Sequence, residues 1–237
     1  LLAEERAQPP DLFQEKYGAV PVKPSALILK EFSNDIHVGN YPYDEHIPVE
    51  IAVDPGYGFP GAHAVLAIQV KEGTPYIVDE IYLQGYVTED IITIMQKRKW
   101  GNKVIGGAID IAGIQHQAMP APVEVWWNKA RIRLDYLKIK DVGAGINLLR
   151  TILKVDPVTK RPGLYINYSC KGFISECGGC KSPVTGGGIW MRDTHTGKEI
   201  DKSNHATKAM IYWLVNRFGF TIKSFRIQPV IDCMRRK

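Results

Sequence analysis

The pattern of hydrophobic and polar positions changes at residue 49. Before it, residues 1–48 are rich in proline and charge and keep no helical or strand period beyond the short run SALIL. After it, three apolar segments, 49–56, 63–73 and 74–85, are separated by turns that contain glycine, which is typical of an antiparallel meander. We therefore expect an entry or interdomain segment at 1–48, wrapped on a domain that begins with three antiparallel strands.

Helical spacing and buried strands alternate after residue 87. Segment 88–101 (TEDIITIMQKRKWG) repeats hydrophobic residues at helical spacing, with Thr88 as the expected N-cap. The segments that follow read as a buried strand, a second strand, a helix and a further strand: 103–113 (KVIGGAIDIAG), 122–127 (PVEVWW), 142–155 (VGAGINLLRTILKV) and 163–169 (GLYINYS). This alternation implies that part of the sheet is parallel.

The C-terminal third contains a glycine-rich stretch and a final helix. Residues 170–199 are glycine-rich and predict a hairpin insertion. Residues 203–217 place apolar side chains at helical spacing. We expect one domain at 49–224, followed by a basic tail at 225–237.

Composition adds modest constraints. Of the 237 residues, 45% are hydrophobic, which is ordinary for a packed core, and apolar stretches such as GAHAVLAIQV are too short to cross a bilayer. We expect a soluble, intracellular protein with no membrane association. Thirty basic against 25 acidic residues give a net charge of +5, which fits a polyanionic partner but is common without one. Four cysteines do not form a disulfide framework, so a reducing compartment is the simpler expectation.

Two apolar runs each end in an aspartate. Asp54 lies in IAVDPGYG and Asp110 in IGGAIDIAG. If the first and fourth strands are neighbours, the two carboxylates lie side by side and need a cation, for which Mg²⁺ or Mn²⁺ with oxygen ligands is suited. Two such ions can activate water and stabilise the leaving oxygen when a phosphodiester is cut. The plainer interpretation of each aspartate is a residue that fixes a turn.

Six motifs together resemble one family. They are VDPG with Asp54, VDEIY with Glu80, AIDIAG with Asp110, GINLLRTIL, LYINYSC and DKSNHATKAMIYWLV. From about Glu31 to Phe218 the chain resembles the C-terminal nuclease domain of tailed-bacteriophage large terminases. The resemblance implies an α/β fold of the ribonuclease H-like (RuvC-like) type: a mixed five-stranded sheet flanked by helices, here with the glycine-rich hairpin insertion.

The last motif bears on a third metal ligand. Many terminases carry an Asp/Asn-His-Ala pattern with a tyrosine about seven residues after the histidine, matched here by Asn204, His205 and Tyr212. Many also carry acids just before the histidine and three residues after it, where this chain has Asn204 and Lys208. His205 is the expected third ligand and Asp201 the alternative, although the former could be an ordinary helix histidine and the latter a cap. Glu80 is a weaker candidate.

The resemblance also implies an activity and its partners. The expected function is a two-metal-ion endodeoxyribonuclease that cuts concatemeric viral DNA during packaging, in the host cell cytoplasm. The chain has no GxxxxGK[ST] phosphate loop, so the ATPase domain of the same polypeptide is expected outside it. Double-stranded DNA, the portal and the small terminase are the expected partners. Alternatives are a RuvC-like recombination nuclease or resolvase, an actin-like ATPase module and a non-catalytic DNA-binding module.

Basic and cysteine-containing segments complete the candidates. Two groups of cations could follow a DNA backbone, although a solvated basic face is the default interpretation: Lys129, Arg131 and Arg133, and Lys171, Lys181 and Arg192. A single CxxC between Cys177 and Cys180, with Cys170 and His195 nearby, is weak support for zinc. We do not expect structural Zn²⁺.

Overall fold

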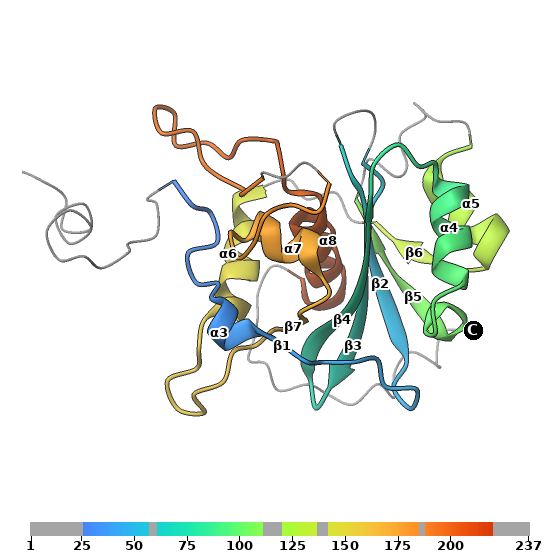
Figure 1. Cartoon of the computed structure of the whole chain (residues 1–237), viewed down its shortest axis with the longest axis horizontal. Coiled ribbons are helices and arrows are strands. Elements are labelled where there is room, and N and C mark those ends of the chain that lie inside the picture. Colours follow the sequence, from blue (N-terminus) through green and yellow to red (C-terminus); the bar gives the residue numbers. More distant parts are fainter. Residues whose placement is uncertain (1–25, 57–60, 111–119, 137–141, 185–187, 220–237) are drawn as a thin grey trace, which may run out of the picture.

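A seven-stranded mixed sheet forms the centre of the computed structural model (Figure 1), which describes residues 26–56, 61–110, 120–136, 142–184 and 188–219. The strand order is β1-β7-β4-β3-β2-β5-β6. The strands are β1 (Val38–Gly39), β2 (Val49–Asp54), β3 (His63–Lys71), β4 (Thr74–Leu83), β5 (Val104–Ile109), β6 (Leu134–Asp135) and β7 (Tyr165–Asn167). The helices are α3 (Asn34–His37), α4 (Thr88–Gln96), the 3-10 turn η1 (Gly101–Lys103), α5 (Pro122–Ala130), α6 (Val142–Leu153), α7 (Lys171–Glu176) and α8 (His205–Phe218).

The pairing of the strands confirms the predicted mixed sheet. Strands β2, β3 and β4 form the antiparallel meander, whereas β5 pairs parallel with β2, and β7 parallel with β4. The five strands predicted from 49–56, 63–73, 74–85, 103–113 and 163–169 are β2, β3, β4, β5 and β7. The count rises from five to seven because the two-residue strands β1 and β6 extend the sheet at its edges.

Segment 122–127 is a helix, so its prediction as a strand was wrong. Pro122 occupies the first helical position after Ala121, where its fixed φ suits a helix and its missing N–H is not needed. Val125 and Trp126 are buried against the sheet, while Trp127 is 51% exposed. A run of β-branched and aromatic residues favours a strand locally, and here tertiary packing overrides that preference.

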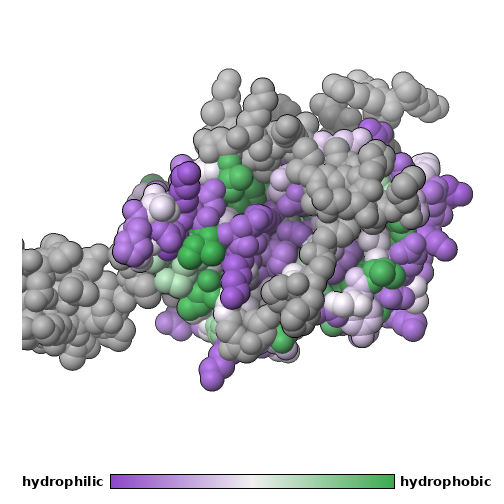
Figure 2. All heavy atoms as spheres, turned by 90° about the horizontal axis from the view of Figure 1, so that it is seen from above, coloured by the Kyte–Doolittle hydropathy of each residue, from purple (hydrophilic) through white to green (hydrophobic). Residues whose placement is uncertain are grey.

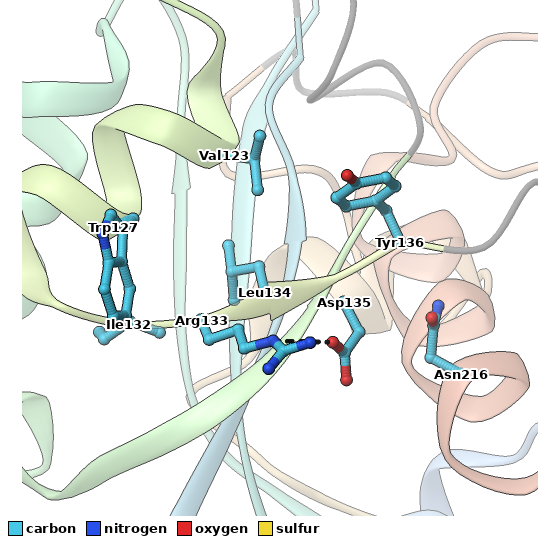
Figure 3. Close-up of a pocket in the computed structure, with 8 residues that line it drawn as sticks. All are labelled: Val123, Trp127, Ile132, Arg133, Leu134, Asp135, Tyr136 and Asn216. Carbon is cyan, nitrogen blue, oxygen red and sulfur yellow. Dashed lines mark ion pairs between the residues drawn. The ribbon is translucent and has the colours of Figure 1, made fainter. Parts of the chain in front are cut away.

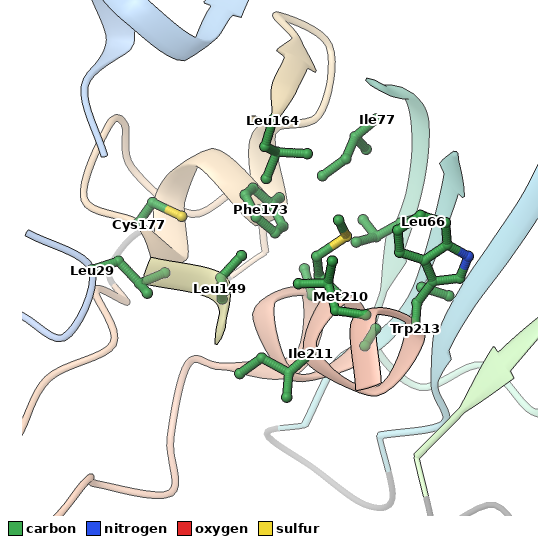
Figure 4. Close-up of a cluster of buried hydrophobic side chains, with 14 of the residues drawn as sticks. Leu29, Leu66, Ile77, Leu149, Leu164, Phe173, Cys177, Met210, Ile211 and Trp213 are labelled. Carbon is green, nitrogen blue, oxygen red and sulfur yellow. The ribbon is translucent and has the colours of Figure 1, made fainter. Parts of the chain in front are cut away.

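Helices cover both faces of the sheet. In Figure 1, α6, α7 and α8 lie on one side and α4 and α5 on the other. Figure 4 shows the larger hydrophobic cluster, on the α8 side, with Leu66 of β3, Phe173 of α7 and Trp213 of α8. The second cluster contains Val53, Ile109 and Trp126. Because side chains alternate along a strand, Ala52 and Ala108 face α8 whereas Val53 and Ile109 face α4 and α5.

The described part of the entry segment packs into the domain. Leu27 forms a β-bridge with Met191, and Ile28 and Phe32 are buried in the cluster on the α8 side. Glu31 forms an ion pair with Arg150 of α6, with an N–O distance of 2.6 Å. Residues 26–39 therefore contribute to the core, although they precede the clean strand pattern.

The glycine-rich segment 170–199 is only partly a hairpin. The segment begins with helix α7. Near its end, a β-bridge between Arg192 and Glu199 closes a short turn. Trp190 is fully buried and donates its indole N–H to the carbonyl of Ile200 at 3.1 Å. The buried side chains of α7 and of Trp190 therefore anchor the segment in the core.

On the face seen in Figure 2, hydrophilic residues predominate and hydrophobic ones form small, separate groups. Among the described residues, no helix combines the length and the apolar character needed to span a membrane.

Candidate metal centre

Asp54 and Asp110 lie at neighbouring positions where two parallel strands end. Asp54 is the last residue of β2, and Asp110 directly follows β5. Val53 pairs with Ile109, and the Asp110 N–H donates to the carbonyl of Val53 at 2.9 Å. The aspartates are the next pair along this register, so both lie on the α8 side with Ala52 and Ala108. They are only 5% and 8% exposed.

The turn after β2 holds Asp54 in place. One of its carboxylate oxygens, Oδ1, accepts the N–H of Gly56 at 2.9 Å. Gly56 has a φ of +47°, and a side chain there would overlap the backbone of Ala62. Asp54 therefore fixes the DPG turn, as in the plainer interpretation, while its other oxygen is not used by that bond.

His205 lies against Asp54. It is the first residue of α8, and its Nδ1 is 3.5 Å from Oδ1 of Asp54. Burial lowers the pKa of His205, but the hydrogen bond and charge of Asp54 and the charge of Glu176 outweigh it, so the net pKa is raised. Asp54 thus has His205 and the backbone of Asp110 as neighbours at one end of the sheet, and the role of the three as metal ligands remains a prediction.

Asp201 lies beside Lys208 of α8. Its Oδ1 accepts a hydrogen bond from the Lys208 ammonium at 2.5 Å and one from the Asn204 amide at 3.1 Å. These two bonds, with that of Lys208 foremost, lower the pKa of Asp201. The Asp201 side chain is 78% exposed, which favours His205 over Asp201 as the third ligand.

Glu80 binds a helix instead of facing the aspartates. Its two carboxylate oxygens accept the N–H groups of Gly172 and Phe173, both at 2.7 Å, at the start of α7. Loss of solvent raises the pKa of Glu80 to about 8, although the two backbone hydrogen bonds oppose the shift. This arrangement supports a structural role for Glu80.

Glu176 was not identified from the sequence. This buried residue of α7 accepts the N–H groups of Ala206 and Thr207, at 3.0 and 2.7 Å, and the hydroxyl groups of Thr207 and Tyr82, both at 2.9 Å. It therefore caps the start of α8 and fixes the turn that carries His205. Nothing in the local sequence marks it, because its partners are distant along the chain.

His63 was also missed. It is 2% exposed, and its Nε2 has no hydrogen-bond partner among the described residues. Burial lowers the pKa of His63 to about 4; the charge of Asp54 raises it and that of His205 lowers it further. The neutral imidazole is thus within electrostatic reach of the centre.

The donor set suits a hard divalent ion. Two adjacent carboxylates provide the oxygen ligands that Mg²⁺ and Mn²⁺ prefer. No group of three or more histidine, cysteine, aspartate or glutamate residues is arranged to hold a metal among the described residues. The thiols of Cys170 and Cys177 are packed in the hydrophobic cluster, and the Cys180 thiol donates to the carbonyl of Lys171 at 3.4 Å.

The first group of candidate DNA-binding cations lies at α5 and β6. Lys129 is exposed in the last turn of α5, and the guanidinium of Arg131 lies 5.7 Å from the ring of Trp127. Arg133 pairs with Asp135 at 3.7 Å and lines a hollow of about 610 Å³ between α5, β6 and α8 (Figure 3). Because β6 pairs with β5, this group is one strand away from the strand that precedes Asp110.

The second group lies around α7. Lys171 begins α7, and Lys181 is exposed beyond its end. Arg192 is partly buried and donates to the carbonyl of Gly197 at 2.9 Å. In Figure 1, α7 and α5 lie on opposite sides of the sheet, so the structure does not bring the two groups together.

Comparisons with known proteins show where this fold also occurs. No family model matches the chain, and no curated protein matches it. Among solved structures, the nuclease domain of the P22 large terminase matches with a TM-score of 0.61 at 17% identity, over 82% of this chain and 94% of that one. The nuclease domain of the g2p large terminase from bacteriophage SPP1, with bound Mn, matches with a TM-score of 0.52 at 15% identity, over 77% and 96%.

A longer protein matches in part. The large terminase of a thermophilic bacteriophage matches with a TM-score of 0.60 at 18% identity, over 90% of this chain. This chain spans about half of that protein, 51% of its length. The chain therefore has the ribonuclease H-like fold of large terminase nuclease domains.

Proposed function

We propose that this chain is the nuclease part of a large terminase, a metal-dependent endodeoxyribonuclease that cuts concatemeric viral DNA during genome packaging. The observation that carries the proposal is the buried pair Asp54 and Asp110 at adjacent strand ends, with His205 against Asp54. The fold shared with terminase nuclease domains, one of them with bound Mn, supports it.

Each residue of the site has a distinct role in the proposed reaction. Asp54 and Asp110 would hold a Mg²⁺ or Mn²⁺ ion, which when bound supplies water activation and stabilises charge on the phosphate. Asp54 also holds the imidazole of His205, and Glu176 fixes the backbone from which that imidazole projects. The two-ion arrangement expected from the sequence remains a prediction, because the described residues bring together two carboxylates rather than a complete set of ligands.

The proposal includes the partners of such an enzyme. Double-stranded DNA is the substrate, and the net charge of +5 is compatible with it. An ATPase domain on the same polypeptide is proposed because the chain spans only 51% of the large terminase from the thermophilic bacteriophage. The portal and the small terminase are the proposed partners in the host cell cytoplasm.

Plasmid nicking tests the proposal. With Mg²⁺ or Mn²⁺ we expect supercoiled DNA to be nicked and EDTA to prevent it, whereas Asp54→Asn and Asp110→Asn abolish nicking because each removes a ligand charge. Asp35→Asn, an exposed aspartate of α3, is the matched control and keeps activity. Wild-type nicking by either site variant would refute the assignment. Cleavage restricted to four-way junctions would favour the resolvase alternative. ATP hydrolysis by the chain would favour the actin-like ATPase alternative.

A further inference from the structure

Lys208 projects from the turn of α8 that faces the two aspartates. It follows His205 by three residues, so the two side chains leave the helix on the same face. The position of that face is fixed by His205, whose Nδ1 lies 3.5 Å from Oδ1 of Asp54. The Lys208 side chain is only 24% exposed, so most of it is packed within this region.

Asp201 holds the ammonium group of Lys208 in place. The Nζ–Oδ1 distance is 2.5 Å, and Asp201 is itself oriented by the amide of Asn204 at 3.1 Å. Burial lowers the pKa of Lys208, but the hydrogen bond and charge of Asp201 and the charges of Asp54 and Asp110 outweigh it, so the net pKa is raised. The ammonium therefore stays charged, on the face of α8 from which His205 reaches Asp54.

Such a charge limits how many metal ions the pair can hold. Two buried carboxylates are stabilised by nearby positive charge, and the Lys208 ammonium already provides some of it, partly offset by the exposed carboxylate of Asp201. A first divalent ion can still bind, because its two positive charges are attracted by two carboxylates. A second divalent ion would be repelled by both the first ion and the ammonium in a region of low dielectric constant.

We propose that the Lys208 ammonium is the second cation of this centre: Asp54 and Asp110 share one divalent ion, and Lys208, oriented by Asp201, takes the place of a second ion beside the phosphate that is cut. The inference rests on the proposed function and changes its ion count from two to one. It also gives Asp201, the alternative metal ligand, a positioning role.

Mn²⁺ binding without DNA tests the inference independently of activity. Calorimetry and electron paramagnetic resonance of the 237-residue chain are expected to give one Mn²⁺ per wild-type molecule. Lys208→Met keeps the aliphatic stem and removes the charge, so we expect about tenfold tighter binding, roughly 1.4 kcal/mol, and a second bound ion. Lys208→Arg restores the cation and the wild-type count, and Lys202→Met, at an exposed lysine before α8, is the neutral control.

Nicking at saturating Mn²⁺ tests the catalytic part. Lys208→Met should nick at least about tenfold more slowly than wild type despite its tighter metal binding, while thermal melting checks that it is folded. Two ions on the wild type, or a Lys208→Met variant with unchanged affinity and ion count, would overturn the inference and leave the proposed function standing. A wild type that neither binds Mn²⁺ nor nicks DNA would overturn both.

Discussion

Four acidic side chains with little contact with water have two different kinds of partner. Asp54 lies beside His205; burial lowers the pKa of Lys208, but the hydrogen bond of Asp201 and the charges of Asp201, Asp54 and Asp110 raise it overall. Glu80 and Glu176 instead accept backbone N–H groups at the starts of α7 and α8. The first kind of environment places carboxylates beside cationic side chains, whereas the second uses carboxylates to satisfy helix ends.

Replacing Glu176 should disturb His205 from a distance. Glu176→Gln removes the negative charge that helps to raise the pKa of His205 and leaves a single acceptor oxygen for four donors. We expect the pKa of His205 to fall in metal-free protein and the free energy of unfolding to drop by about 1–3 kcal/mol. An NMR titration of the imidazole and urea denaturation measure the two effects.

The control for this variant is Glu124→Gln, at an exposed position in the first turn of α5. It should change neither quantity. An unaltered pKa of His205 in Glu176→Gln would contradict the positioning role of Glu176.

The raised pKa of Glu80 predicts that the free energy of unfolding depends on pH. Its pKa is about 8 in the folded protein against 4.5 ordinarily, so the folded state holds a proton that the unfolded chain releases between these values. The free energy of unfolding therefore falls as pH rises through this interval, by at most about 1.4 kcal/mol per pH unit. His63, with a pKa lowered to about 4 from 6.5, acts in the opposite direction but only below pH 6.5.

The contribution of Glu80 is therefore best measured between pH 6.5 and about 8, where His63 does not titrate, and in the presence of EDTA. Wild-type protein should lose about 1 kcal/mol or more of stability across it, measured by urea denaturation. Glu80→Gln, which resembles the protonated side chain, should lose less. The raised pKa of His205 gives a decline of the same sign, so part of the slope remains in the variant. Equal slopes in both proteins would exclude Glu80 as the source.

At the scale of elements, the close approach of β5 to β2 brings the aspartates together. Gly107 pairs with Ile51, and a side chain at Gly107 would overlap the backbone carbonyl of Ile51. The absence of a side chain thus permits the backbone spacing that places Asp54 beside Asp110.

Gly107→Ala should push the two strands apart. We expect the free energy of unfolding to fall by about 2 kcal/mol or more and Mn²⁺ affinity to fall with it, because the two ligands separate. Ile105→Ala, on the same strand at a position that is 61% exposed, is the control and should retain metal binding. Normal Mn²⁺ affinity in Gly107→Ala would show that this spacing is not needed.

The sequence was most informative where local pattern and position agree. Strands β2 and β5, each with an aspartate at its end, follow from apolar runs that meet a turn, and α8 follows from its helical period. Helix α5 could not be read locally, because its β-branched and aromatic residues favour a strand until Trp126 packs against the sheet. Glu176 could not be found either, because its backbone partners at α8 are 30 and 31 residues away.

At the scale of the whole molecule, the two basic groups lie on opposite sides of the sheet. The group around α7 shares the α8 side with the two aspartates, whereas the group at α5 and β6 adjoins β5, the strand that leads to Asp110. Because β6 directly follows β5 in the sheet, we expect DNA bound at the metal centre to contact Lys129 and Arg133 rather than Lys171 and Lys181.

Salt dependence of DNA binding tests this arrangement. If about six phosphates are neutralised, affinity should fall about a thousandfold between roughly 50 and 200 mM salt. Lys129→Gln combined with Arg133→Gln should reduce the slope of log affinity against log salt by about two, because two phosphate contacts are lost. Fluorescence anisotropy with several DNA sequences measures the slope.

Two further variants complete the comparison. Lys154→Gln, at an exposed position just after α6, should leave the slope unchanged. If the pair Lys171→Gln and Lys181→Gln reduces it instead, DNA crosses the other side of the sheet.

The two glutamates that cap α7 and α8 act in series. Glu80 of β4 binds the first turn of α7, and Glu176 at the other end of α7 binds the first turn of α8. Both sets of hydrogen bonds therefore depend on the position of α7. We expect the amide protons of four residues to exchange with solvent deuterium in one cooperative opening: Gly172, Phe173, Ala206 and Thr207. His205 would then approach or leave Asp54 of β2 in the same event that releases α7 from Glu80, two strands away on β4.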